Sequence, residues 1–465
     1  MRALRLLALI IIGGLVAVGV VLDERDRDLT EIDPPVLVST ADSRTGTWFC
    51  AGGSGAVGSA AVGLEIVNAG TDDAIAEVQL VLDTTDDGQR IEVDLAAGSR
   101  TPINLPQFAP DAAWLGAIVE IDDADVTVEQ TFDGLSGTDR APCATATASS
   151  LFSADGATRV LAEGETMTVL LMNPFQDDAI ADIRFDADVG PDSLSAVVIP
   201  ARRVVAIDVT EEVTVAARVH TSVTVTSGRL VANRLQVRNG AVLRGLAVTP
   251  FVQDGATVSV LPVLATDLGV FDRIHVTNPS DTTAEVDLEI VTDGSATLDP
   301  IELTVRAGRT VVVDVATESR LAALPAFSVV ARSLTGTPVA VAVERAAVLD
   351  ADVVPGTAAM PALDAAATAW LVALDGNVSD IAVVNPSSDA IATVQIQVDG
   401  QTVESFELGP GRRQTVDGTA FGARAIVRVD ASAPVVVGRA NEGFTSRQML
   451  AGVVADGAVA LDQLD

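Results

Sequence analysis

Histidine is the side chain that enzymes use most often as a general acid or base, and the chain contains two, His220 and His275. His275 alternates with Ile274 and Val276 in a strand-like run, so we predict that its side chain faces water. His220 stands beside Thr221 where a similar run ends. No Ser or Cys motif accompanies either histidine, and the Gly-x-Ser-x-Gly pattern of a nucleophile elbow is absent. The sequence therefore predicts no catalytic residue, and we expect a protein that is not an enzyme.

Other reactive side chains are scarce. The chain has no Lys, which excludes a Schiff-base lysine and a P-loop lysine, and two histidines are too few for a His-rich metal site. Carboxylates could bind Ca²⁺, which prefers six to eight oxygen ligands, but no EF-hand pattern is present. The acidic clusters are Asp72-Asp73, Asp86-Asp87, Asp122-Asp123 with Asp125, and Asp177-Asp178. We predict that they form solvated turns, with no metal and no cofactor, and Ca²⁺ binding remains the alternative.

Arginine recurs between pairs of alternating apolar runs. The segments are Gly98-Ser99-Arg100, Ala201-Arg202-Arg203, Gly308-Arg309 and Gly411-Arg412-Arg413. Such turn tips could hold carboxylates or anionic glycans, because guanidinium matches carboxylate geometry. With 64 acidic residues in the chain, surface ion pairs are the interpretation we favour.

The two cysteines, Cys50 and Cys143, are 93 residues apart and flank one stretch of strand-like sequence. In an exported protein such a pair indicates a disulfide that closes one domain, worth about 4–5 kcal/mol in the chain-entropy model. Two free buried thiols are the alternative. A reactive cysteine is not expected, because no histidine lies in the same stretch to activate it.

Charge and size limit the partners. The 465 residues carry a formal net charge of -35, and all 29 positive side chains are Arg. A chain this acidic repels phosphate backbones, so we expect no nucleic-acid partner. The length suggests about three or four domains. We interpret the negative charge as the solvated surface of those domains.

The N-terminus has the pattern of a membrane-targeting segment. Arg2 and Arg5 precede an apolar run over 6–22, and a charged stretch over 23–28 follows it. Positive charge before the run and acid after it predict a cytoplasmic N-terminus with the bulk of the chain outside. We favour an uncleaved signal anchor over 1–22, followed by a charged spacer over 23–43. Cleavage near Ala17-Val18-Gly19, which would release a secreted protein, is the alternative.

The remainder repeats one unit four times. Each unit has an apolar strand that ends in Asn, and the four asparagines are 105, 105 and 107 residues apart. They are Asn68, Asn173, Asn278 and Asn385. Pro follows all but the first, where Ala69 stands instead. Asn-Pro ends a strand, because Pro cannot donate to the ladder and Asn satisfies local backbone groups, so we predict turn residues and not ligands.

Seven short alternating runs fit into the third unit, as is typical of an immunoglobulin-like sandwich. We therefore predict an all-β protein of four tandem immunoglobulin-like β-sandwich domains after an N-terminal transmembrane helix. The predicted domains are 44–140, 141–254, 255–360 and 361–465. Units of this size can each bury a core, so we expect domains with modest mutual contacts. A four-bladed propeller is the weaker alternative, because a blade needs only about 40–50 residues.

The opening Trp48-Phe49-Cys50 with Gly52-Gly53, the terminal anchor and the Asn-Pro-x-x-Asp turns resemble an uncharacterised actinobacterial family of exported or membrane-anchored proteins. The resemblance covers the chain from about residue 44 onward. It implies a role at the cell envelope and no catalytic residues, since the family has no established activity. The departure at Ala69 affects only a turn.

Together these features predict a non-enzymatic, membrane-anchored extracytoplasmic protein that acts as an envelope scaffold or protein-interaction and adhesion module. The alternative is an accessory module that binds envelope polysaccharide or its biosynthetic machinery. Sugar platforms usually use exposed Trp and Tyr, but the chain has no Tyr and three Trp, at 48, 114 and 370. The expected partners are the membrane, through the N-terminal helix, and other envelope proteins or glycans.

Overall fold

The structure, a computed structural model, describes residues 45–464 with short gaps. The gaps are 57–59, 123–124, 160–162, 241–243, 254, 265–270, 295–297, 322–323, 325, 348–355, 375–378, 443–446, 452 and 457. The predicted signal anchor and charged spacer therefore lie outside the described residues. No helix in the described part is long and apolar enough to cross a membrane.

The described chain is almost entirely β-structure, as predicted, and it repeats one pattern of strands four times. The first unit contains β1 (Thr45–Ser54), β2 (Ala61–Asn68), β3 (Ala74–Leu82), β4 (Arg90–Leu95), β5 (Ser99–Asn104), β6 (Trp114–Asp122), β7 (Val126–Gly134) and β8 (Gly137–Pro142). The second contains β9 (Ser150–Ser153), β10 (Thr166–Asn173), β11 (Ala179–Ala187), β12 (Gly190–Ile199), β13 (Arg203–Asp208), β14 (Val219–Ser227), β15 (Val231–Asn239), β16 (Arg244–Pro250) and the short β17 (Val252–Gln253).

The second half of the chain follows the same pattern. The third unit contains β18 (Val258–Leu264), β19 (Phe271–Asn278), β20 (Ala284–Thr292), β21 (Ile301–Val305), β22 (Arg309–Asp314), β23 (Phe327–Ser333), β24 (Ala340–Ala347) and β25 (Gly356–Pro361). The fourth contains β26 (Ala365–Ala373), β27 (Ser379–Asn385), β28 (Ala392–Val398), β29 (Gln401–Leu408), β30 (Arg412–Asp417), β31 (Ile426–Glu442), β32 (Arg447–Ala451), β33 (Val453–Asp456) and β34 (Val459–Ala460). The helical elements are short: η1 (Leu105–Phe108), α2 (Val209–Glu212), η2 (Gly418–Phe421) and η3 (Leu461–Gln463).

The alternating sequence pattern explains the strands. In β3, Ala76, Val78 and Leu80 are buried, whereas Glu77 and Gln79 between them are half-buried. Side chains of a strand point to opposite faces of its sheet, so this period of two gives each sheet one apolar face. Two such sheets in each unit bring their apolar faces together around a core.

All four units use the same strand order. One sheet has the order fourth, third, sixth and first strand, and the other has the order fifth, second, seventh and eighth. In the fourth unit, the long β31 supplies both the sixth and the seventh strand. The second strand thus pairs with the fifth and the seventh, whereas in the immunoglobulin order it pairs with the first and the fifth. The units are two-sheet all-β structures with a pairing order of their own.

The first and second units share core residues, and so do the third and fourth, contrary to the expected chain of weakly contacting domains. The core of the first unit includes Leu235, Leu246 and Val248 from the second. The core of the fourth unit likewise includes Val258 and Val260 from the third. The described residues accordingly belong to one compact unit.

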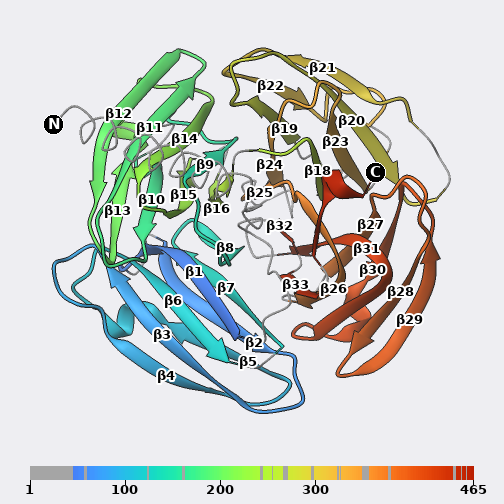
Figure 1. Cartoon of the computed structure of the whole chain (residues 1–465), viewed down its shortest axis with the longest axis horizontal. Helices are drawn as coiled ribbons and strands as arrows, with labels where there is room; N and C mark the ends of the chain where they lie inside the picture. The colour runs from blue at the N-terminus through green and yellow to red at the C-terminus, as the bar shows by residue number, and fades with distance from the viewer. Residues whose placement is uncertain are drawn as a thin grey trace, which may run out of the picture. The chain divides into compact units, whose positions relative to one another are not determined.

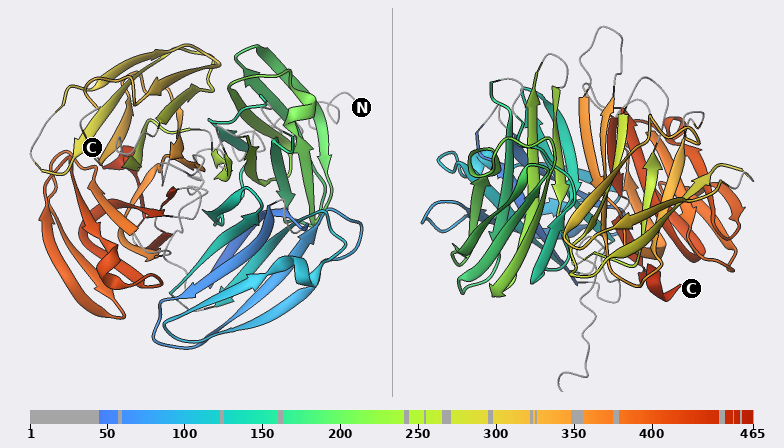
Figure 2. Two further views of the ribbon diagram at one scale, coloured as in Figure 1. Left: turned by 180° about the vertical axis from the view of Figure 1, so that it is seen from behind. Right: turned by 90° about the horizontal axis from the view of Figure 1, so that it is seen from above.

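The eighth strands connect the four units in a cycle. β8 contacts β16, β16 contacts β25, β25 contacts β32, and β32 contacts β8. Figure 1 shows these four strands surrounded by the other strands of their units, and Figure 2 shows the four units from behind and from above. The first and last units of the chain are therefore neighbours, and the polar groups at their junction form the site described below.

Candidate functional site: a buried charge network at the unit junctions

The seventh strands carry charged side chains that are buried. Glu129 in β7, Arg234 in β15, Arg345 in β24 and Arg439 in β31 are each at most 2% exposed. The prediction that the charged residues of the strands form a solvated surface is wrong for these positions. The face of the sheet that points away from its own core is covered here by another unit.

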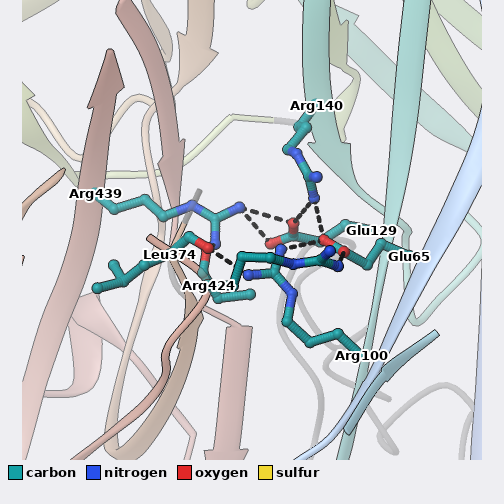
Figure 3. Close-up of polar contacts among 8 residues, drawn as sticks. Glu65, Arg100, Glu129, Arg140, Leu374, Arg424 and Arg439 are labelled. Carbon is teal, nitrogen blue, oxygen red and sulfur yellow. Dashed lines mark hydrogen bonds and ion pairs between the residues drawn. The ribbon is translucent and has the colours of Figure 1, made fainter. Parts of the chain in front are cut away.

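Glu65 in β2 is the acceptor for a group of arginines from the first and fourth units (Figure 3). Arg100 and Arg140 both donate to its Oε2 atom, and a guanidinium nitrogen of Arg424 lies 3.6 Å from its Oε1 atom. Arg100 also donates to the carbonyl of Leu374 in the fourth unit. Burial raises the pKa of Glu65, but hydrogen bonds and charge from Arg100 and Arg140 outweigh burial and hold its pKa below the usual value.

Glu129 and Arg439 make the second contact of this junction. One terminal nitrogen of Arg439 donates to both carboxylate oxygens of Glu129, at 2.7 Å each, and the other donates to the carbonyl of Ala373. Arg140 lies 3.4 Å from Glu129 and so connects this pair to Glu65. Burial lowers the pKa of Arg439, and the charge of Glu129 opposes that effect. Two carboxylates and several arginines thus join the ends of the repeat array.

Two further buried pairs lie within the second and third units. Arg234 donates to the carboxylate of Asp155 and, at 2.6 Å, to the hydroxyl of Thr249. Arg345 makes a bidentate contact with Asp272, at 2.8 and 2.7 Å. Separating the two members of a buried ion pair costs free energy, because each would remain as an uncompensated buried charge. These pairs therefore fix the positions of the strands that carry them.

Asp139 in β8 lies at the junction between the first and second units. It is 3% exposed and accepts a hydrogen bond of 2.7 Å from the backbone N–H of Val248 in β16. Burial raises the pKa of Asp139 to about 7, although that hydrogen bond and the charges of Arg234 and Arg140 act in the opposite direction. This carboxyl therefore changes charge near neutral pH.

One of the two histidines, His275, does not lie where the sequence placed it. His275 is 1% exposed and does not face water; its Nε2 atom is 3.7 Å from Oε2 of Glu344. His220 is half-buried, with Nδ1 at 2.8 Å from the carbonyl oxygen of Ala154. The alternation that put His275 on the face away from the core of its own unit was correct, but another unit covers that face.

The four repeat asparagines have one structural role. Each is fully buried, and its side-chain amide donates to two backbone carbonyls while its oxygen accepts from a backbone N–H two residues later. For Asn173 these partners are the carbonyls of Asp177 and Ile199, at 2.8 and 3.0 Å, and the N–H of Phe175, at 3.0 Å. The corresponding bonds recur at Asn68, Asn278 and Asn385. These side chains join the second strand of each unit to the turn after it and to the end of the fourth strand.

The recurring arginines bridge units instead of forming only surface ion pairs. Arg203 donates to the carbonyl of Thr85 in the first unit at 2.7 Å. Arg413, whose side chain is 1% exposed, contacts Asp293 in the third unit at 2.9 Å. Arg412 donates to the carbonyl of Gly294, also in the third unit, at 3.1 Å. With Arg100, four of the recurring arginines contact the unit that precedes their own in the cycle, so we find an inter-unit role where the sequence indicated a solvated one.

The acidic doublets cap turns. Asp73 and Asp178 accept from the backbone N–H groups of Ala97 and Ala201, at 2.9 Å in each case. Asp86, Asp87, Asp122 and Asp177 are exposed, and Asp123 lies outside the described residues. Among the residues that the structure places, no group of three or more His, Cys, Asp or Glu side chains could hold a metal ion.

Cys50 and Cys143 form the predicted disulfide, with an S–S distance of 2.04 Å. It fastens the segment that follows β8 onto β1, next to a backbone bridge between Phe49 and Ala144. The second and third units make the same return with hydrogen bonds alone, through β17 against β9 and through Leu363 against Val260. The disulfide thus strengthens a contact that belongs to the repeated pattern.

The tryptophans serve packing. Trp370 is fully buried and donates to the carbonyls of Ala367 and Val435, at 3.2 and 2.9 Å. Trp48 is 5% exposed, and Trp114 is half-buried between the cores of the first two units. None of the three is an exposed platform for stacking on a sugar.

Comparisons with known proteins name no function. No family model matches the chain, and no curated protein matches it. Among solved structures, the crystal structure of Thermotoga maritima 1070 is similar to 24% of this chain, over 95% of its own length, at 15% identity and a TM-score of 0.21.

The network joins strands of different units through buried ion pairs and hydrogen bonds. The sequence contained one signal for it, because Arg234, Arg345 and Arg439 occupy the same place in three repeats at the end of an apolar strand. A charged residue that recurs beside core positions indicates a buried partner, since an unpaired buried charge is very costly. The partners themselves, such as Glu129 for Arg439, come from another unit, and the local pattern does not identify them.

Proposed function

We propose that the protein is a non-enzymatic, membrane-anchored extracytoplasmic scaffold, whose four β-sandwich units, immunoglobulin-like in architecture, present one rigid surface to other envelope proteins. The observation that carries the proposal is the junction between the first and last units, where Arg439 pairs with Glu129. The repeats use their recurring polar residues to fix the units relative to one another. A scaffold needs that rigidity, because ordering flexible parts on binding costs free energy.

Two other features support the location. The disulfide between Cys50 and Cys143 is typical of proteins in oxidising compartments. The apolar run over 6–22, between Arg5 and Asp23, has the length and flanking charge of a signal anchor.

The location is tested by membrane fractionation of cells that make the full-length protein, with protease added to intact spheroplasts. We expect the protein in the membrane fraction, degraded from outside, with an intact mass that rises by two protons on reduction. A protected protein with free thiols contradicts the proposal. A secreted protein with a new N-terminus near Val20 supports the scaffold but replaces the anchor by a cleaved signal.

The scaffold role is tested by crosslinking in cells, comparing the native protein with R439M. If partners bind a surface that spans several units, loosening the junction between the first and last units lowers crosslinking to all of them. Arg184→Gln, which removes an exposed pair with Asp186, is the matched control and should leave crosslinking unchanged. Purified protein that converts a candidate envelope substrate would overturn the non-enzymatic assignment.

A further inference from the structure

A small cavity lies where the connections between the second, third and fourth units come together. Its volume is about 10 Å³, which is about the space that one water molecule needs. The polar residues that line it are Gln253 at the end of β17, Ser259 in β18, and Asp364 in the connection between β25 and β26. The cavity therefore borders both segments by which the chain passes into and out of the third unit.

Ser259 and Asp364 lie opposite each other across this cavity. Next to them, the backbone groups of Val260 and Leu363 bond to each other in both directions, at 2.7 and 2.9 Å, in an antiparallel bridge. Side chains that neighbour such a pair point to the other face, because side chains alternate along a strand. The hydroxyl of Ser259 and the carboxyl of Asp364 thus share one face, which is the face that lines the cavity.

The other units place a large side chain where the third unit has Ser259. The bridge between Val260 and Leu363 has counterparts in the first two units. The residue just before the bridge on the first strand of each unit is Trp48 in the first unit and Leu151 in the second, and both belong to apolar cores. The third unit leaves most of that volume unfilled by a side chain.

The returning segment shows the same difference at Ala362, which also lines the cavity. The corresponding residue of the first unit is Cys143, which forms the disulfide with Cys50. That of the second unit is Phe251, which is 1% exposed in the core. Two small residues of the third unit thus stand where the first two units have a disulfide or a large apolar side chain, and the cavity is the space between them.

The hydroxyl of Ser259 points to a ligand in this space. Ser259 is 4% exposed, and among the described residues its Oγ atom has no hydrogen-bond partner. A buried hydroxyl without a partner is costly, so nearly all such groups are bonded to protein or to ordered water. The carboxyl group of Asp364 supplies a strong acceptor on the same cavity.

We propose that the cavity is a binding site for one water molecule, which accepts a hydrogen bond from the hydroxyl of Ser259 and donates one to the carboxyl group of Asp364. The amide of Gln253 borders the same space, so the site offers the two to four polar partners that a buried water requires. A cation such as Ca²⁺ needs six to eight oxygen ligands, and the rest of the lining is mostly apolar, including Val339 and Val341 of β24. The water joins β18 to the connection with the fourth unit, as the disulfide joins the matching segments of the first unit. The proposal concerns the fold and does not depend on the scaffold role.

A high-resolution crystal structure of the protein tests the site directly. We expect one density peak within about 3 Å of both Ser259 Oγ and a carboxylate oxygen of Asp364. Three results would overturn the proposal: no density at that place, a direct hydrogen bond from Ser259 to another protein atom, or a peak with the short, numerous oxygen contacts of a metal ion.

A pair of serine variants tests the site in solution. Ser328 in β23 is also fully buried, but its hydroxyl donates directly to the carbonyl of Pro262, so S328A is the matched control. If Ser259 is bonded to water, S259A and S328A should each raise the equilibrium constant of unfolding about five-fold in urea unfolding, because each loses one buried hydrogen bond. If the cavity is dry, S259A removes an unpaired hydroxyl and lowers that constant. An S259A protein that is as stable as the native one, or more stable, contradicts the water site, whatever the effect of S328A.

Discussion

Arg439, near the end of the chain, donates two hydrogen bonds of 2.7 Å to Glu129, 310 residues earlier, and both side chains are almost fully buried. The pair joins the last unit of the repeat to the first. The first-to-second and third-to-fourth junctions rely on shared apolar cores, so this junction is chemically distinct from them.

Removal of one member of the pair should therefore destabilise the protein strongly. R439M leaves the buried carboxylate of Glu129 without this partner, and E129Q leaves the buried guanidinium of Arg439 without an opposite charge. We therefore expect each change to lower the free energy of unfolding by about 3–5 kcal/mol. The double variant R439M/E129M should cost less than the sum of the single changes. Urea unfolding followed by tryptophan fluorescence measures this.

The control for that experiment is the exposed pair of Arg184 and Asp186, where the side chain of Arg184 is 56% exposed. Arg184→Gln should cost less than about 1 kcal/mol, as is usual for surface ion pairs. Equal effects of R184Q and R439M would show that burial does not govern the strength of the junction.

The repeat asparagines give a second prediction. Asn173→Ala removes three hydrogen bonds and leaves two buried carbonyls and one N–H without a side-chain partner. We expect a loss of about 2–4 kcal/mol in the free energy of unfolding. Asn173→Asp keeps the acceptor but cannot donate, so it should be nearly as harmful. Gln176→Ala, in the same turn but exposed, should change stability by no more than about 0.5 kcal/mol, and an equally mild N173A would contradict the role assigned to the amide.

A third prediction concerns the turn between the fourth and fifth strands. Three units place Gly at positive φ there, at 98, 308 and 411, whereas the second unit has Arg202 with φ of 53°. A side chain in this region is strained, so Arg202→Gly should stabilise the protein by about 0.5–1 kcal/mol despite the greater freedom of Gly in the unfolded chain. Gly411→Arg is the reverse change and should destabilise it. Thermal unfolding of both variants decides the matter, and a destabilised R202G would be the opposing result.

The elements that the sequence predicts are those that depend on local pattern. The alternation around Val78 identifies a strand, the spacing of the asparagines identifies the unit, and two cysteines at the ends of one unit identify the disulfide. Each of these predictions uses residues of a single unit only. The strand prediction also uses the two-residue alternation of side chains, which every β-sheet shows.

The alternation of side chains along a strand has one limit, which explains why the exposure predicted for His275 and for the charged strand residues was wrong. It states that His275 and Glu129 point away from the core of their own unit, but it cannot distinguish water from the surface of another unit. The pairing order is out of reach of the sequence for a related reason. β2 pairs along its whole length with β7, far along the chain, and no local signal selects that partner. All contacts between units join residues that are far apart in the sequence. A reading of local pattern therefore cannot distinguish packed units from separate domains.

The last prediction uses the carboxyl at the junction between the first and second units. The pKa of Asp139 is raised by burial from 3.8 to about 7. The folded state therefore holds a proton that the unfolded state releases, and the stability linked to this proton is fully present below pH 3.8 and lost as the pH rises to 7. Asp139→Asn keeps an acceptor for the N–H of Val248 and carries no charge at any pH.

We expect the free energy of unfolding of D139N, relative to the native protein, to rise by roughly 2–4 kcal/mol between pH 4.5 and pH 8. The comparison isolates Asp139, because every other titrating group is common to both proteins. Urea unfolding at the two pH values measures it. A constant difference between the two proteins would mean that Asp139 is already ionised in the folded state at pH 4.5, with Arg140 and Arg234 compensating its burial. In that case the junction would owe its geometry to an ion pair and not to a neutral carboxyl.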